Sequence, residues 1–177
     1  MNEQLRDVVK IRPARVADIP SMMRLDRQSP TAAHWTEQQY AQALQSPGGS
    51  AGRIALVAEM TLDVAPLESS KVEQGIALAG FLVAQHIAPE WELENIVVAP
   101  EVRNQGIGER LLNELLAHAN ETNSLSVFLE VRESNFAARK LYDKAGFQPT
   151  GRRNSYYADP VEDALLYCRS LPNPFSH

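Results

Sequence analysis

Two glycines and an arginine stand where an apolar strand passes into a helix. In the stretch ENIVVAPEVRNQGIGERLLNELL, Arg103, Gly106 and Gly108 occupy the turn between the two. A helix N-terminus exposes unpaired backbone N–H groups and a partial positive charge. Glycine lets the backbone approach a ligand closely, and arginine adds a fixed positive charge. The turn therefore indicates a site for a pyrophosphate.

The same turn has two other interpretations. It is a plain helix cap with a tight turn, or it belongs to a dinucleotide-binding site. Glu130 lies about where the ribose-binding acid of a dinucleotide site stands. However, Leu111 occupies the place of the third glycine, so only a Gly-x-Gly match remains. No Gly-Lys-Ser/Thr follows the turn, which excludes the P-loop pattern.

Hydrophobic periodicity places this turn within a mixed order of strands and helices. Apolar or alternating runs predict strands over 8–15, 53–60, 75–87, 90–100, 125–131, 147–154 and 163–170, and helical spacing predicts helices over 18–28, 34–44 and 134–145. Residues 47–52 break the chain, and the polar stretch 61–74 predicts a long hairpin loop. The order predicts an α+β fold with a mixed, largely antiparallel sheet of about seven strands flanked by about four helices.

Three of the expected helices carry specific signals. The helix after the glycine turn has six apolar residues on one face: Ile107, Leu111, Leu112, Leu115, Leu116 and Ala119. Thr36 and Gln39 form a capping box, and Trp35 and Tyr40 occupy the two positions of a hydrophobic staple. Gly146 is expected to cap the helix over 134–145 at its C-terminal end.

Composition restricts the class of protein. The chain has 177 residues and 44% hydrophobic content, which predicts a single soluble domain over residues 1–177. A formal net charge of −5 argues against general nucleic-acid binding. No signal peptide or membrane-spanning run is evident, so we expect a cytoplasmic protein that does not bind a membrane. The four histidines show no metal-ligand spacing, so no metal is expected.

Three stretches resemble one enzyme family. VVAPEVRNQGIGERLL resembles the acetyl-CoA-binding motif of the GNAT N-acetyltransferases, (Arg/Gln)-x-x-Gly-x-(Gly/Ala), and LEVRESNFAARKLYDKAGF resembles the next motif of that family. GRRNSYYADPVEDALLY is similar to the closing segment of the bacterial ribosomal-protein-alanine N-acetyltransferase branch. The resemblance covers about residues 9–170. It implies a GNAT fold whose sheet is splayed at the acetyl-CoA-binding strands. It also implies an enzyme that transfers acetyl from acetyl-CoA to the N-terminal α-amino group of a protein, with ribosomal protein alanine as the named acceptor.

The family reaction needs a base and an acid. An α-amino group has a reference pKa near 8, so it must lose a proton before it attacks a thioester, and a positioned carboxylate could remove that proton directly or through a water. The resemblance makes Glu130 this base and Tyr142 the acid that protonates the leaving CoA sulfur. Glu130 is otherwise a surface or ion-paired strand residue, and Tyr142 is otherwise core. Glu92 is the rival base, because other GNAT branches carry a glutamate at about this offset in the preceding strand.

The resemblance also names the residues that contact acetyl-CoA. Backbone groups beside a bulge in ENIVVAP are expected to bind the pantetheine arm, and Asn135 matches a position that hydrogen-bonds CoA, although it is equally typical of an ordinary helix start. The expected acetyl-CoA contacts are Ile96, Val97, Val98, Arg103, Asn104, Gln105, Gly106, Ile107, Gly108, Asn135, Ala138 and Tyr142.

The acceptor is expected to meet an aromatic pair. Tyr156 and Tyr157 are predicted to lie in a loop between the last two strands, where amphipathic phenols pack on a peptide. Tyrosines are also common in edge loops without such a role. Together with Glu92 they form the expected substrate-binding set. Two other functions stay open: acetylation of a small amine or a lysine side chain, and a non-catalytic CoA-binding regulatory domain.

Overall fold

The computed structural model describes residues 9–45, 52–63 and 74–172. They form one seven-stranded sheet in the order β1-β2-β3-β4-β5-β7-β6. The strands are β1 (Val9–Pro13), β2 (Arg53–Asp63), β3 (Gln74–Ile87), β4 (Glu90–Val98), β5 (Ser126–Arg132), β6 (Gln148–Ala158) and β7 (Val161–Ser170). The α-helices are α2 (Ile19–Gln28), α3 (Glu37–Gln45), α4 (Ile107–Glu121) and α5 (Phe136–Lys144). The predicted α+β architecture is confirmed.

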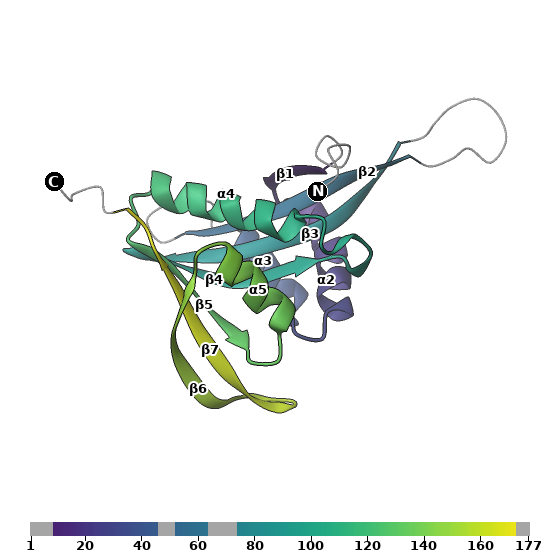
Figure 1. The fold of residues 1–177 in the computed structure, drawn as a ribbon. Coiled ribbons are helices and arrows are strands. Elements are labelled where there is room, and N and C mark those ends of the chain that lie inside the picture. Colours follow the sequence, from purple (N-terminus) through teal and green to yellow (C-terminus); the bar gives the residue numbers. More distant parts are fainter. Residues whose placement is uncertain (1–8, 46–51, 64–73, 173–177) are drawn as a thin grey trace, which may run out of the picture.

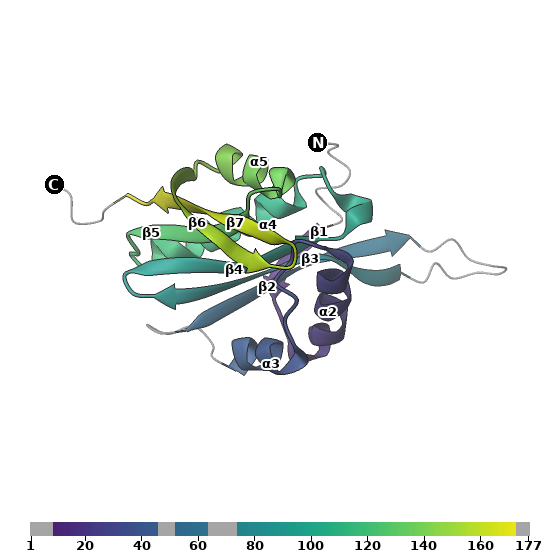
Figure 2. The same cartoon turned by 90° about the horizontal axis from the view of Figure 1, so that it is seen from below.

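The helices cover both faces of the sheet. Helices α2 and α3 lie on one face and α4 and α5 on the other, as the two views in Figures 1 and 2 show. Three of the helices show the features that their local sequence predicts. All six apolar residues predicted on one face of α4 are buried. Thr36 and Gln39 exchange the hydrogen bonds of a capping box before α3. After α5, Gly146 has φ +82° and completes a Schellman-type end.

The sheet parts between β4 and β5. This pair is parallel, whereas every other pair in the described sheet is antiparallel. Pairing runs only from Glu90 with Ser126 to Leu93 with Leu129, although both strands continue further. In Figure 1, β5 and the β6–β7 hairpin turn away from β4 beyond this point. The predicted splay is confirmed, and it leaves one edge of β4 without a strand partner.

A bulge accompanies the splay. Opposite the neighbouring residues Val83 and Ala84 of β3, strand β4 places Asn95 and Leu93, so Glu94 is the extra residue. An extra residue reverses which face the following side chains point to. Trp91 accordingly contacts α4, whereas Asn95 contacts side chains of α2 and α3 on the opposite face. The bulge therefore turns Asn95 toward the α2–α3 side.

Two predicted boundaries were wrong. Residues 61–63 and 74 belong to β2 and β3 rather than to a loop, because the β2–β3 ladder continues to Asp63 and Gln74; residues 64–73 lie outside the described residues. So do 47–51 of the predicted chain break. Tyr156 and Tyr157 lie in β6, not in a loop. Strand β6 advances four residues from Arg153 to Tyr157 while β7 advances two, and this irregularity hides the strand from a period-two pattern.

Candidate functional site

The glycine turn presents an uncapped helix start. Asn104 and Gly106 both have left-handed backbone, with φ of 61° and 82°. Gly106 is the N-cap of α4, and no side chain among the described residues caps this helix. Its first-turn N–H groups are therefore left for a ligand. The phosphate interpretation fits this geometry, and the choice between it and a plain glycine cap stays a prediction.

The two glycines of the turn are needed for different reasons. Gly106 provides the left-handed φ that starts the helix. Gly108 lies where a Cβ would be 3.1 Å from Leu141 Cδ2 of α5 and 3.6 Å from Val98 Cγ2 of β4. It permits α4 to pack closely between its neighbours at the end of β4. Spacing alone cannot separate these two needs.

Arg103 is fixed beside the turn by two partners. Its Nε donates to the Val98 carbonyl oxygen at 3.2 Å, and a terminal nitrogen donates to Ser29 Oγ at 2.9 Å. The arginine thus joins the end of β4 to the end of α2. Ser29 had no signal in the sequence. Next to it, Gln105 Oε1 is buried and accepts no hydrogen bond from any described residue, so a ligand donor or water is needed there.

Three carboxylates meet where β4 and β5 part. Glu94 accepts two hydrogen bonds from Arg53, at 2.8 and 2.9 Å, and Glu130 Oε1 lies 2.9 Å from Arg153 Nε. Glu92 has no ion pair with a described residue. Burial first, and then the charges of Glu94 and Glu130, raise the pKa of Glu92 above its ordinary value.

These surroundings bear on both candidate bases. Glu130 is only 18% exposed, is ion-paired with Arg153, and accepts a hydrogen bond from the Tyr156 hydroxyl, which raises the pKa of Tyr156. Because the pKa of Glu92 is raised, it lies closer to the pKa of an amine. This favours proton transfer from the ammonium group to Glu92. Glu130 and Glu92 are brought together, and the choice between them stays a prediction.

Tyr142 lies in the core of the α5 side. Its ring packs between Phe147 and Tyr167, with centroids 5.9 and 6.2 Å away. Burial first, and then the nearby Tyr157, raise the pKa of the Tyr142 phenol. The phenol keeps its proton at neutral pH, which is the form that a proton donor needs. The core role is present, and the acid role stays a prediction.

The remaining predicted site residues lie at the start of α5, in β6 and at the end of β4. Asn135 caps α5, because its Oδ1 accepts from the Ala138 N–H at 3.2 Å, and its Nδ2 donates to Thr31 Oγ1 at 3.0 Å. The rings of Tyr156 and Tyr157 are in edge contact, with centroids 5.2 Å apart. The guanidinium of Arg132 lies 4.0 Å from the Tyr157 ring, and that of Arg153 lies 5.4 Å from the Tyr156 ring. Ile96, Val97 and Val98 pair with β3 but have no strand on the β5 side, and Ile107 is buried at the start of α4.

Neither a metal centre nor a membrane span is evident in the described residues. Over these ranges, no three His, Cys, Asp or Glu side chains gather in a way that would hold a metal ion. No helix in the described part of the chain has the length and apolar character to cross a membrane.

Comparison with known proteins assigns the fold and its relatives. Residues 26–147 match the model of the acetyltransferase (GNAT) family. The chain is 36% identical over 98 residues to the [ribosomal protein bS18]-alanine N-acetyltransferase of Escherichia coli (strain K12), a match that covers 54% of this chain and 66% of that protein. A Bacillus subtilis (strain 168) protein with a provisional name of the same kind is 38% identical over 95 residues, covering 54% of this chain and 63% of that one. The matches therefore span less than two thirds of these relatives.

A solved structure extends the likeness to nearly the whole chain. Ard1 from Thermoplasma volcanium superposes with a TM-score of 0.74 at 27% identity, covering 93% of this chain and 98% of that one.

Proposed function

The chain belongs to the GNAT acetyltransferase family, and on this premise we propose that it transfers an acetyl group from acetyl-CoA to the N-terminal α-amino group of a protein, with ribosomal protein alanine as the acceptor. The observation that carries the proposal is the meeting of three features at one place. An uncapped helix start, an unpartnered edge of β4 and a group of carboxylates lie around the point where β4 and β5 part.

The glycine turn and the edge of β4 suit the acyl donor. The N–H groups at the start of α4 would receive the pyrophosphate, with Arg103 adding positive charge. Ile96, Val97 and Val98 pair with β3 on one side and have no strand on the β5 side, where the pantetheine arm would lie in the manner of an added strand. The buried, unpartnered Gln105 Oε1 offers a further acceptor. Asn135 and Ala138 complete the proposed donor contacts at the start of α5.

The carboxylates and the phenol suit the transfer itself. Bound acetyl-CoA supplies an acetyl thioester. Glu130 takes a proton from the acceptor's ammonium, and the amine lone pair then attacks the carbonyl carbon. The C–S bond breaks as Tyr142 gives a proton to the departing sulfur. The second proton that the nitrogen loses as the amide forms replaces the one that Tyr142 gave, and the proton on Glu130 passes to solvent. Direct transfer with both substrates bound needs no covalent enzyme intermediate. We take the whole chain to be one such domain and place its reaction in the cytoplasm, as parts of the same proposal.

The acceptor assignment rests on the acidic and aromatic surroundings of Glu130. A protein N-terminus carries one positive charge near neutral pH. Where β4 and β5 part, the three carboxylates of Glu92, Glu94 and Glu130 outnumber the two guanidinium groups of Arg53 and Arg153. Tyr156 is half exposed beside Glu130 and presents an amphipathic face to a peptide.

The test is mass spectrometry of an Ala-initiated peptide, with the sequence of a ribosomal protein N-terminus, after incubation with acetyl-CoA. We expect one acetyl group on the α-amine and a loss of about 10²–10⁴ in rate for Glu130→Gln. Loss with Glu92→Gln and not with Glu130→Gln would transfer the base to Glu92. A peptide with a blocked α-amine and a free lysine distinguishes the two acceptors: its acetylation would show that the enzyme modifies lysine side chains. Binding of acetyl-CoA without any turnover on peptides or small amines would point to a regulatory domain.

A further inference from the structure

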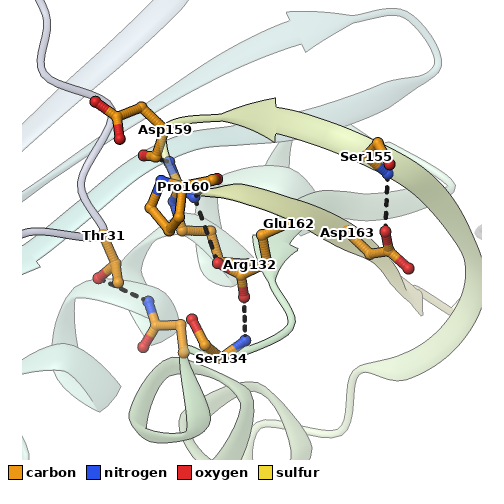
Figure 3. A network of polar contacts seen from close by, with 9 residues as sticks. Thr31, Arg132, Ser134, Ser155, Asp159, Pro160, Glu162 and Asp163 are labelled. Carbon is orange, nitrogen blue, oxygen red and sulfur yellow. Dashed lines mark hydrogen bonds and ion pairs between the residues drawn. The ribbon is translucent and has the colours of Figure 1, made fainter.

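Arg132 contacts the turn that joins β6 to β7. It stands at the end of β5 with a side chain only 15% exposed. Its guanidinium donates to the carbonyl oxygens of Asp159 at 3.2 Å and Pro160 at 3.4 Å, and lies 3.4 Å from Glu162 Oε2. Figure 3 shows Arg132 reaching from β5 to this turn. One side chain thus holds two consecutive carbonyls and a carboxylate of the hairpin.

The same guanidinium covers Tyr157. Its central carbon lies 4.0 Å from the centroid of the Tyr157 ring, which is cation–π contact. Arginine suits this position because its planar fork stacks on a ring while its edge donates several hydrogen bonds. Lysine, with a single point charge, cannot do both. The rotamer of Tyr157 and the position of the turn are therefore fixed together.

Tyr157 is linked to Glu130 through its neighbour Tyr156. The rings of Tyr156 and Tyr157 are in edge contact, with centroids 5.2 Å apart, and the Tyr156 ring lies 5.4 Å from the guanidinium carbon of Arg153. The Nε of Arg153 is 2.9 Å from Glu130 Oε1. Tyr156 also hydrogen-bonds Glu130. A shift of this end of β6 would move both tyrosines relative to Glu130.

Further contacts hold the partners of Arg132. Glu162 accepts a hydrogen bond from the Ser134 N–H, and Ser134 and then Arg132 keep the pKa of Glu162 below its ordinary value, so it is charged at neutral pH. Ser155, with φ 50°, donates its N–H to Asp163 at 2.8 Å and so fixes the irregular segment of β6. Figure 3 shows these contacts around the hairpin.

We propose that Arg132 is a positioning residue for the acceptor: it fixes the β6–β7 turn and, through the ring of Tyr157, the tyrosine-bearing end of β6 beside Glu130. This inference rests on the proposed function, because it assigns that end of β6 to the acceptor. Arg132 itself contacts neither substrate. Its effect falls on the peptide and not on acetyl-CoA, whose proposed contacts are on β4, α4 and the start of α5.

The experiment compares Arg132→Gln and Arg132→Lys with the wild type. Steady-state rates are measured with the Ala-initiated peptide and acetyl-CoA varied independently, and backbone hydrogen exchange is followed by mass spectrometry in the absence of substrates. The matched control is Arg169→Gln, since Arg169 also donates from a strand to a backbone carbonyl, that of Ala145, but lies toward the other end of β7.

For Arg132→Gln we expect the KM of the peptide to rise about tenfold and the KM of acetyl-CoA to stay within about twofold. Arg132→Lys should be intermediate. Exchange should accelerate in peptides covering 153–163 and stay unchanged in α4. The control should leave the KM of the peptide and the exchange of 153–163 unchanged.

Equal changes in both KM values, or unchanged exchange over 153–163, would overturn the proposal. If the wild type acetylates no N-terminal peptide, the proposed function fails separately. In that event the exchange measurement still decides whether Arg132 fixes the hairpin: acceleration limited to 153–163 supports it, and its absence overturns it.

Discussion

Gly80 allows β3 to approach β4 at the site, and its replacement by alanine should be costly. A Cβ at this position would lie 2.7 Å from the Val97 carbonyl oxygen, and 3.4 Å from both Val98 Cα and Leu111 Cδ1. The first distance is about 0.7 Å short of ordinary van der Waals contact. The obstacle is a backbone oxygen of the neighbouring strand, so no side-chain rotation relieves it.

The cost follows from the need to move β4. Overpacking of a well-packed interior typically costs about 1–3 kcal/mol. For a chain of 177 residues, each kcal/mol lowers the midpoint of thermal unfolding by about 2–4 °C. A central value of about 2 kcal/mol for Gly80→Ala therefore predicts a melting temperature lower by roughly 4–8 °C. Since Val97 is a proposed donor contact, the affinity for acetyl-CoA should also fall.

The assay is thermal unfolding by circular dichroism, with acetyl-CoA affinity from calorimetry. Gly151→Ala is the control, because it is also a strand glycine, but its Cβ would meet nothing nearer than Leu166 Cδ1 at 3.8 Å. Alanine there should be neutral or slightly stabilising, since it restricts the unfolded chain. Melting temperatures for the two variants within about 1 °C of each other would refute the reasoning.

Two further substitutions test buried charge. Burial and like charges raise the pKa of Glu92 above 4.5, so the folded state keeps this proton to higher pH than the unfolded state. The free energy of unfolding should therefore fall as the pH rises from 4.5 through the raised pKa of Glu92. Glu92→Gln should unfold at a higher urea concentration than the wild type at pH 7, but not below about pH 4. A less stable variant at pH 7 would contradict this. Asp26 is 1% exposed and accepts from the Trp35 N–H and Asn95 Nδ2, at 2.9 and 3.3 Å, so Asp26→Ala should cost roughly 3 kcal/mol in urea unfolding. A cost below about 1 kcal/mol would show that these donors find other partners.

Features set by neighbouring residues could be predicted from the sequence. The apolar face of α4 repeats at the helical period, and the capping box of Thr36 and Gln39 spans three residues, so both follow directly from the pattern. Gly106 and Gly146 have the positive φ that their places at helix ends require. Each of these depends on interactions within one or two turns of chain.

Features set by distant pairs could not be predicted. The ion pair of Arg53 with Glu94 and the hydrogen bond of Arg103 to Ser29 join residues 41 and 74 positions apart, and no local period encodes either. The carboxylate of Glu130 could be singled out, but its partner Arg153 could not. The two residues meet only in the folded sheet, where β6 lies on the far side of β7 from β5 and Arg153 reaches across. The same holds for Arg132, whose partners lie across a hairpin irregularity that also concealed the strand of Tyr157.

The short seam between β4 and β5 has a consequence for how the chain is made. Strands β1 to β4 are all complete by Val98, and β5 to β7 begin only at Ser126, so spatial halves of the sheet are also successive halves of synthesis. Until β5 leaves the ribosome, β4 presents an open edge, which is a template for unwanted pairing. Helix α4 is synthesised in between and contacts all of β1 to β5. It can therefore cover one face of β1 to β4 before β5 to β7 are synthesised. The four parallel residue pairs between β4 and β5 then form on a sheet whose α4 face is already covered.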